Sequence, residues 1–467
     1  MVDLILTEQY GSTQDIISFT QHGNEIVEVK PQKNFFKCIF SFTTFFREIL
    51  LPYGYPQSVS DDYLEYQTWD TLQALCSTIT GSFTMRAVLR GVGVGDSKAT
   101  ALSAALTWIM KEGAGMIGRI VFAWWKGSEL DHNCKKWRFF ADILNDAAML
   151  IELCLPQFQQ YSTEVLCVTS VMKSIVGIAG GATRASITYH QAIKDNVADI
   201  SAKDGSQETV VNLIGSFASI FLLNYFTDST SEWLLILSLI ILHLYTNYMA
   251  VKSLVFKNFN NQRIAIVLKT FLTVGTVPSP SKVNSNEAIL HGFDQTVKRI
   301  CGFEIILGES ISKPLKLYTV AELKQILSVY EQEKYLLLVH SEKRKIYVSF
   351  EHGENARDVI AAYFHAVLLA IATSIYNSTS LDIYSKRQLH HTTPIAIIHT
   401  FMNAYEKYID DYRNIPFNYL IPFNKLVKQE FNMFVTALTV NGWSMGSHSM
   451  KVGEHRIDFK THKAKLT

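Results

Sequence analysis

Charged residues interrupt a long apolar stretch between Ala99 and Trp125. Lys111, Glu112 and Arg119 lie there among three glycines. Glu112 and Arg119 are seven residues apart, so a helix would place them on one face. Charges within a membrane helix are costly, face the interior of the bundle and usually mark a functional site. We give equal weight to a second interpretation, in which the helix breaks at the glycines and the charges lie at the water interface.

Two further charges occur in neighbouring apolar stretches. Asp146 has no basic residue one helical turn away, whereas Asp142 follows Arg138 by four residues and would form an ordinary helical ion pair. Lys173 lies one turn before a GxxxG pair, a spacing that lets helices approach closely. We expect five charged residues to line a ligand cavity in which the cations attract an anionic ligand. They are Lys111, Glu112, Arg119, Asp146 and Lys173.

Known catalytic and metal-binding patterns do not occur in the sequence. It has no nucleophile triad signature and no phosphate-binding loop of the GxxxxGK[ST] type. The six cysteines form no CxxC pair, and no histidine cluster lies near them at zinc spacing. The formal net charge of +1 gives no overall field that would draw in nucleic acid. We therefore predict no catalytic residue, no metal, no cofactor and no nucleic-acid partner.

Six helix-length apolar segments must position these charges between Leu51 and Asn261. The segments are Tyr63–Arg90, Ala99–Trp125, Phe139–Leu155, Glu164–Ala182, Thr209–Phe226 and Trp233–Val251. Charged residues make up 18% of the chain, below the usual value of about 25%. The segments therefore favour a helical bundle embedded in membrane lipid, with its longest polar connection at residues 184–208.

Basic residues are unequally shared between the two sets of alternate connections. One set carries ten, namely Lys126, Lys135, Lys136, Arg138, Arg184, Lys194, Lys203, Lys252, Lys257 and Arg263. The other set carries two, Arg90 and Lys98. Because cytoplasmic loops gather Lys and Arg, we predict an intracellular membrane protein with both termini in the cytosol.

The composition predicts three regions. Residues 1–50 form a lead-in with a strand-like alternation at Glu25–Val29, and residues 51–277 form the membrane-embedded helical core. The stretch VPSPSKVNSN is typical of a linker. Residues 285–467 follow as a small α+β domain, in which KYLLLVHSEKRKIYVSFEHG predicts a β-hairpin. The fold class is thus mainly α, with a polytopic bundle of about six helices before the α+β domain.

Several long motifs resemble one known family. They are TWDTLQALCSTITGS, RGVGVGDSKATALSAALTWIMKEGAGMIGRIVFAWWKGSELD, KKWRFFADILNDAAM, GGATRAS and DNVADISAKDGSQETVVNLIG. Together they are similar to the core of the root UVB sensitive family, of the animal type, over roughly residues 35–265. The resemblance implies a membrane protein linked to vitamin B6 homeostasis, with no enzymatic reaction to assign.

These observations lead to two functional hypotheses. In the first, a non-enzymatic integral membrane protein binds or carries a small anionic metabolite; the resemblance makes a phosphorylated vitamin B6 vitamer the candidate. In the second, the chain is a membrane adapter that binds a protein partner or family paralogue through its C-terminal domain. In that case the charges among the helices would be structural ion pairs.

Overall fold

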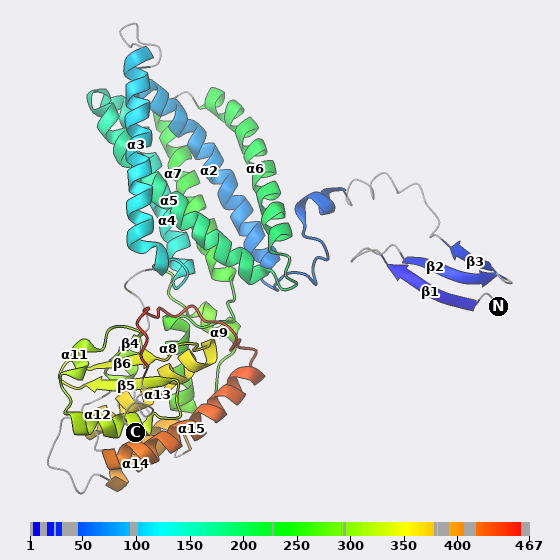
Figure 1. The fold of residues 1–467 in the computed structure, drawn as a ribbon. Coiled ribbons are helices and arrows are strands. Elements are labelled where there is room, and N and C mark those ends of the chain that lie inside the picture. Colours follow the sequence, from blue (N-terminus) through cyan, green and yellow to red (C-terminus); the bar gives the residue numbers. More distant parts are fainter. Residues whose placement is uncertain are drawn as a thin grey trace. The chain divides into compact units, whose positions relative to one another are not determined.

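The computed structural model describes residues 3–9, 16–22, 25–29, 45–93, 101–226, 228–290, 292, 296–377, 381, 392–405 and 417–458. The chain divides into two compact units, Met1–Leu254 and Val255–Thr467 (Figure 1). We call them the helical unit and the C-terminal unit.

A small antiparallel sheet comes first in the helical unit. Its strands are β1 (Asp3–Gln9), β2 (Ile16–His22) and β3 (Glu25–Val29), paired in that order. Residues Ser18 and His22 of β2 lie opposite Val29 and Glu25 of β3. The strand predicted from the alternation at residues 25–29 is therefore confirmed.

Six long helices form most of the rest of the helical unit in the part of the chain that the structure describes. They are α2 (Tyr63–Gly91), α3 (Ala101–Lys126), α4 (Cys134–Leu153), α5 (Ser162–Gln191), α6 (Val197–Tyr225) and α7 (Ser229–Ser253). Short 3-10 turns, η1 (Gly127–Glu129), η2 (Leu155–Gln157) and η3 (Gln159–Tyr161), flank α4. Helix α4 packs against α2, α5 and α7, while α3 packs against α5 and α6 against α2.

Composition supports fewer membrane spans than the predicted number of about six. Among the described helices, α5, α6, α7 and α13 (Ala356–Tyr376) are long and apolar enough to cross a membrane. Charged side chains interrupt α2, α3 and α4. The apolar windows of α5, α6 and α7 are 17%, 11% and 39% buried, but that of α13 is 83% buried. Helix α13 is therefore explained as the core of the C-terminal unit.

The predicted connection at residues 184–208 is mostly helical, which corrects the sequence interpretation. Helix α5 continues to Gln191 and α6 begins at Val197, so only five residues lie between the two helices. Several basic residues counted as loop charges also lie within helices, among them Arg138 of α4 and Arg184 of α5. Lys98 lies outside the described residues. The loop charges are thus fewer and less unequal than the sequence indicated.

The C-terminal unit places a three-stranded sheet and several helices around α13. Strand β6 (Lys345–Phe350) lies between β4 (Glu304–Leu307), which is parallel to it, and β5 (Tyr335–His340), which is antiparallel. The predicted hairpin is therefore present. The remaining helices are α8 (Asn261–Val274), α9 (Pro280–Ser285), α10 (Lys298–Cys301), α11 (Ser312–Leu315), α12 (Val320–Val329), α14 (Pro394–Tyr405) and α15 (Phe417–Val440).

The predicted linker is part of this unit's folded structure. Pro280 occupies the first turn of α9, where its missing N–H costs no hydrogen bond. The Trp443 indole donates to the carbonyl of Pro278 at 2.9 Å, and Asn284 bonds the backbone of Phe256. Helix α8 is buried in the same core. The structural boundary thus follows Leu254, whereas the sequence interpretation assigned residues up to 277 to the helical core.

Candidate functional site

One face of α4 carries a row of ionisable side chains. Arg138, Asp142, Asp146 and Glu152 are four, four and six residues apart. This spacing keeps them within about a third of the helix circumference and spreads them over about 21 Å of its length. Each contacts a polar side chain from a neighbouring helix. We call these four residues and their partners the α4 column; the partners are Asp70, Asn247, His243 and Lys173.

A histidine bonded on both sides lies at the centre of the α4 column. His243 Nδ1 of α7 is 2.8 Å from Asp146 Oδ2, and its Nε2 is 3.2 Å from Gln73 Nε2 of α2. The side chains of His243 and Asp146 are 2% and 4% exposed. Because an ionised carboxylate only accepts hydrogen bonds, His243 donates from Nδ1 to Asp146.

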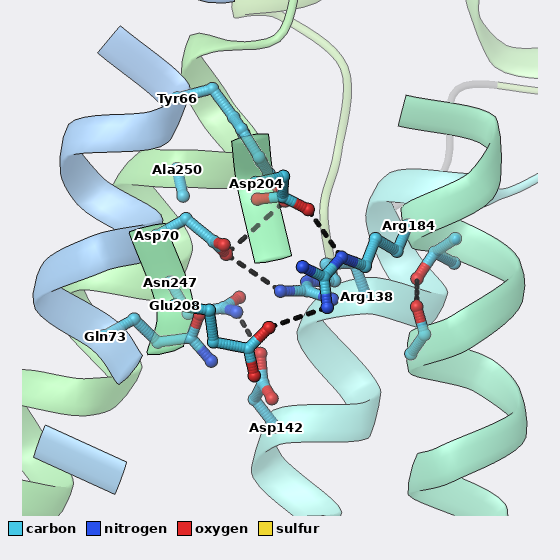
Figure 2. Close-up of polar contacts among 12 residues, drawn as sticks. Tyr66, Asp70, Gln73, Arg138, Asp142, Arg184, Asp204, Glu208, Asn247 and Ala250 are labelled. Atoms are coloured by element: carbon cyan, nitrogen blue, oxygen red, sulfur yellow. Dashed lines mark hydrogen bonds and ion pairs between the residues drawn. The ribbon is translucent and has the colours of Figure 1, made fainter. Parts of the chain in front are cut away.

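The next contacts along α4 join it to α7 and α2, as Figure 2 shows. The Asn247 amide donates to Asp142. Arg138 Nη2 lies 2.8 Å from Asp70 Oδ1, and the Tyr66 hydroxyl donates to the same oxygen at 3.4 Å. Arg138 therefore forms its ion pair with Asp70. The four-residue spacing had suggested Asp142 as the partner. A partner from another helix displaces the local one because it completes a contact across the bundle.

Two cations of α5 pair with acids on other helices. Lys173 Nζ is 2.5 Å from Glu152 Oε2 of α4. Arg184 Nε is 2.5 Å from Asp204 Oδ2, and its Nη1 is 2.7 Å from Glu208 Oε2, both on α6 (Figure 2). The side chains of Lys173 and Arg184 are each 37% exposed, so both cations can be reached from outside the bundle core.

A row of glycines separates these two cations on α5. Lys173, Gly177, Gly180 and Arg184 recur at spacings of four, three and four residues, so they share one face. A Cβ added to Gly180 would meet no heavy atom within 4 Å, and one on Gly177 would lie 3.8 Å from Arg119 Nη2 of α3. Three cations thus surround a backbone strip without side chains, which we call the α5 glycine strip.

Comparison with protein families identifies the chain. A family model described as "Vitamin B6 photo-protection and homoeostasis domain" matches residues 39–275, and one described as "Root UVB sensitive protein, C-terminal" matches residues 276–459. The chain belongs to the root UVB sensitive family. The two matches meet within the stretch that joins α8 to α9, about one helix later than the division between the compact units.

Individual members of the root UVB sensitive family resemble the chain at several levels of identity. "RUS family member 1" of Dictyostelium discoideum is 45% identical over 62% of this chain and 56% of its own length. "Protein root UVB sensitive 3" of Arabidopsis thaliana is 37% identical over 69% of this chain and 74% of its own length. No solved structure matches the chain.

Several buried acceptors of this family member have unused hydrogen-bonding capacity. Within the described residues, no partner contacts Asp146 Oδ1, Asn247 Oδ1, Glu152 Oε1 or Thr80 Oγ1. Asp146 and Asn247 belong to adjacent turns of the α4 column, and both are almost fully buried. Buried polar atoms normally have partners, so these oxygens are acceptors that the described residues leave unsatisfied.

The structure divides the five residues predicted to bind a ligand. Asp146 and Lys173 lie in the α4 column, and Arg119 reaches the α5 glycine strip. Lys111 Nζ instead lies 4.3 Å from the ring centroid of Trp108 on its own helix, while Glu112 is exposed. Whether the five residues bind a ligand remains a prediction, but they do not form one cluster.

The sequence interpretation missed the partners that complete the α4 column. His243 and Asn247 share a face of the most apolar segment, a pattern that indicates a polar partner on another helix. Glu152 is a single acid within AAMLIELCL, which carries the same implication. Neither pattern names the partner, because Gln73 and Asp142 lie in other helices.

Proposed function

We propose that the chain is a non-enzymatic integral membrane protein that binds a small anionic metabolite among the helices of its helical unit. The observation that carries this proposal is the inverted distribution of polarity. The α4 column gathers ionisable groups inside the unit, whereas large apolar side chains cover its outside.

The exposed apolar residues belong to α3, α6 and α7 above all. Trp124 of α3 is 85% exposed, Phe221 of α6 is 74% exposed and Ile241 of α7 is 68% exposed. Soluble monomers rarely leave contiguous apolar areas of this kind in water. Lipid as the surrounding solvent accounts for them, and it also accounts for ionisable side chains that face inward.

The α5 glycine strip is the place best suited to an anion. Lys173 and Arg184 border it, and Arg119 approaches it from α3. Both α5 cations already bind carboxylates while remaining partly exposed. A phosphate could therefore accept from a remaining N–H of Lys173 or Arg184 while each cation keeps its carboxylate partner. The family domain is described by vitamin B6 homoeostasis, which supports a phosphorylated vitamer as the metabolite.

Binding by the purified full chain tests this proposal. Protein in lipid nanodiscs is titrated with pyridoxal 5′-phosphate and, in parallel, with unphosphorylated pyridoxal. We expect saturable binding of the phosphorylated form, at least tenfold weaker binding in Lys173→Gln and Arg184→Gln, and no change in Lys194→Gln, an exposed lysine between α5 and α6. Equal binding by all four proteins would contradict the proposal.

The adapter hypothesis makes a different prediction for the same proteins. If the ion pairs only hold the helices together, none of these proteins binds the vitamer, the unmodified chain included. We expect the protein to lie in an intracellular membrane with both termini in the cytosol. Protease added to cells should then remove terminal epitope tags only after the plasma membrane has been opened. Protection of either tag in opened cells would contradict that orientation.

A further inference from the structure

We propose that His243 exchanges a proton inside the helical unit, with Asp146 holding one side of its ring and the Gln73 amide adapting to the other. The proton exchange itself does not rest on the proposed function. Only its purpose does, because the proton would accompany movement or release of the metabolite.

The contacts of His243 can satisfy both protonation states. In the neutral ring, Nδ1–H donates to Asp146 and Nε2 accepts from the Gln73 amide N–H₂. In the imidazolium, Nε2–H needs an acceptor instead. A half-turn of the Gln73 amide exchanges its N–H₂ for its carbonyl oxygen at nearly the same position. Neither state leaves a ring nitrogen of His243 without a partner.

Several ionisable groups surround His243. Helix α4 presents Arg138, Asp142 and Asp146 to this region, and α2 presents Asp70 together with the thiol of Cys76. Arg138 is bound to Asp70. No Lys or Arg among the described residues forms an ion pair with Asp142 or Asp146, so a negative charge on Asp146 has no ion-pair partner among these residues but His243. A proton on His243 offsets part of that charge, while burial of the ring opposes it.

Two residues next to His243 carry an unsatisfied acceptor. Asp146 Oδ1 and Asn247 Oδ1 are buried and accept no hydrogen bond from any described residue. Proton exchange at Nε2 requires the Gln73 amide to move aside for a water molecule: one N–H bond of the ring then forms or breaks, and the proton passes from or to that water. Within the described residues, no group of three His, Cys, Asp or Glu side chains is arranged to hold a metal ion. These observations favour a proton as the exchanged species.

The α4 column extends from this point in both directions. Asp142, Arg138 and Tyr66 continue it toward the start of α4, and Glu152 with Lys173 continues it toward the end. Chains of Asp, Glu and His inside helical membrane proteins commonly carry protons. His243 of α7 contacts Asp146, which lies between these two ends of the column, and this position fits a proton that enters from one end of the unit and leaves at the other.

Nitrogen-15 NMR of the histidine rings tests the inference on the full chain in lipid nanodiscs. The His243 signals are assigned by their loss in His243→Gln. We expect the neutral ring to carry its proton on Nδ1 and to gain a second proton between about pH 5 and pH 9. In Asp146→Asn the midpoint should move down by about one to three pH units, because the carboxylate that stabilises the imidazolium is removed. In Gln73→Glu it should move up, because a carboxylate then accepts from Nε2–H.

The control is Glu164→Gln, an exposed acid at the start of α5, which should leave the midpoint unchanged. A His243 ring that keeps one protonation state from pH 5 to pH 9 would overturn the inference, as would a neutral ring protonated on Nε2. If Asp146→Asn does not fold, the direction of the Gln73→Glu shift decides. Vitamer binding is measured on the same samples: binding with a locked His243 defeats only this inference, and a titrating His243 without binding defeats only the proposed function.

Discussion

Glu152 and Lys173 form an ion pair whose two members differ in exposure. The carboxylate side chain is 2% exposed and the lysine side chain is 37% exposed, with Oε2 and Nζ 2.5 Å apart. The second oxygen, Oε1, is buried and has no partner among the described residues. The acid therefore depends on the lysine, whereas the lysine can still turn toward its surroundings.

This asymmetry predicts unequal effects of removing each partner. Lys173→Met leaves a buried, unpaired carboxylate and should destabilise the protein by about 3–5 kcal/mol. Glu152→Gln should cost clearly less, and adding it to Lys173→Met should restore most of the loss. Thermal unfolding in detergent and cellular abundance measure the effects, with Lys194→Met as the control. Equal losses of stability in the two single variants would contradict the difference in exposure between Glu152 and Lys173.

Helix α7 gives a prediction about the surrounding medium. Ile241 lies midway along α7 and is 68% exposed. If lipid covers it, Ile241→Arg should cost about 2.5–3.5 kcal/mol on insertion and reduce the fraction that resists alkaline carbonate extraction. Val440→Arg in the C-terminal unit changes a side chain that is 80% exposed and should have no effect. Release of the unmodified chain by carbonate would contradict membrane integration.

The structural boundary predicts which fragment folds. Residues 255–467 should unfold in one cooperative transition, because α8 contributes Ile264, Leu268 and Phe271 to the core. Residues 285–467 lack α8 and should give a weakly cooperative or insoluble product. Circular dichroism during heating compares the two fragments. Indistinguishable transitions would show that α8 is dispensable to the core.

A buried histidine makes the C-terminal unit sensitive to acid. Burial, aided by Lys428, lowers the pKa of His365 to about 3 from its ordinary value of 6.5, and the ring contacts the Tyr335 hydroxyl at 3.2 Å. Below about pH 6.5 His365 therefore binds a proton in the unfolded chain, whereas in the folded chain it stays neutral down to about pH 3. The free energy of unfolding is therefore unaffected by His365 above pH 6.5. It falls by about 1.4 kcal/mol per pH unit as the pH drops from about 6.5 to about 3.

Denaturant unfolding of residues 255–467 between pH 7 and pH 4 measures this loss. His365→Gln should flatten the decline, whereas His352→Gln, which changes an exposed histidine, should not. A decline of equal slope in the His365 variant would assign the acid sensitivity to other groups.

Patterns within one segment of the sequence predicted the strands and helices that depend on that segment alone. The strand Glu25–Val29 and the hairpin of β5 and β6 follow from alternating side chains, and the six long helices from apolar runs. The ends of α5 and α6 could not be predicted this way. Their polar residues look like a loop, but Arg184 and Asp204 pair across the two helices and stabilise both ends.

The same limit applies to the candidate site and to the unit boundary. Spacing along one helix suggested that Arg138 pairs with Asp142, although Asp70 lies 68 positions away in sequence and is the actual partner. A proline- and serine-rich stretch suggested a linker, but Trp443 from near the end of the chain fixes it in place. Such contacts depend on which helices meet, which one sequence does not specify.

Helix α13 has a consequence for how the chain is made. Its composition resembles that of α5, α6 and α7, yet its apolar window is 83% buried by its own unit. During synthesis α13 leaves the ribosome before α14 and α15, which later pack against it. In that interval the nascent chain offers the insertion machinery a segment that it could mistake for another span. If the helical unit enters a membrane during synthesis, closure of the C-terminal core would therefore compete with erroneous insertion of α13.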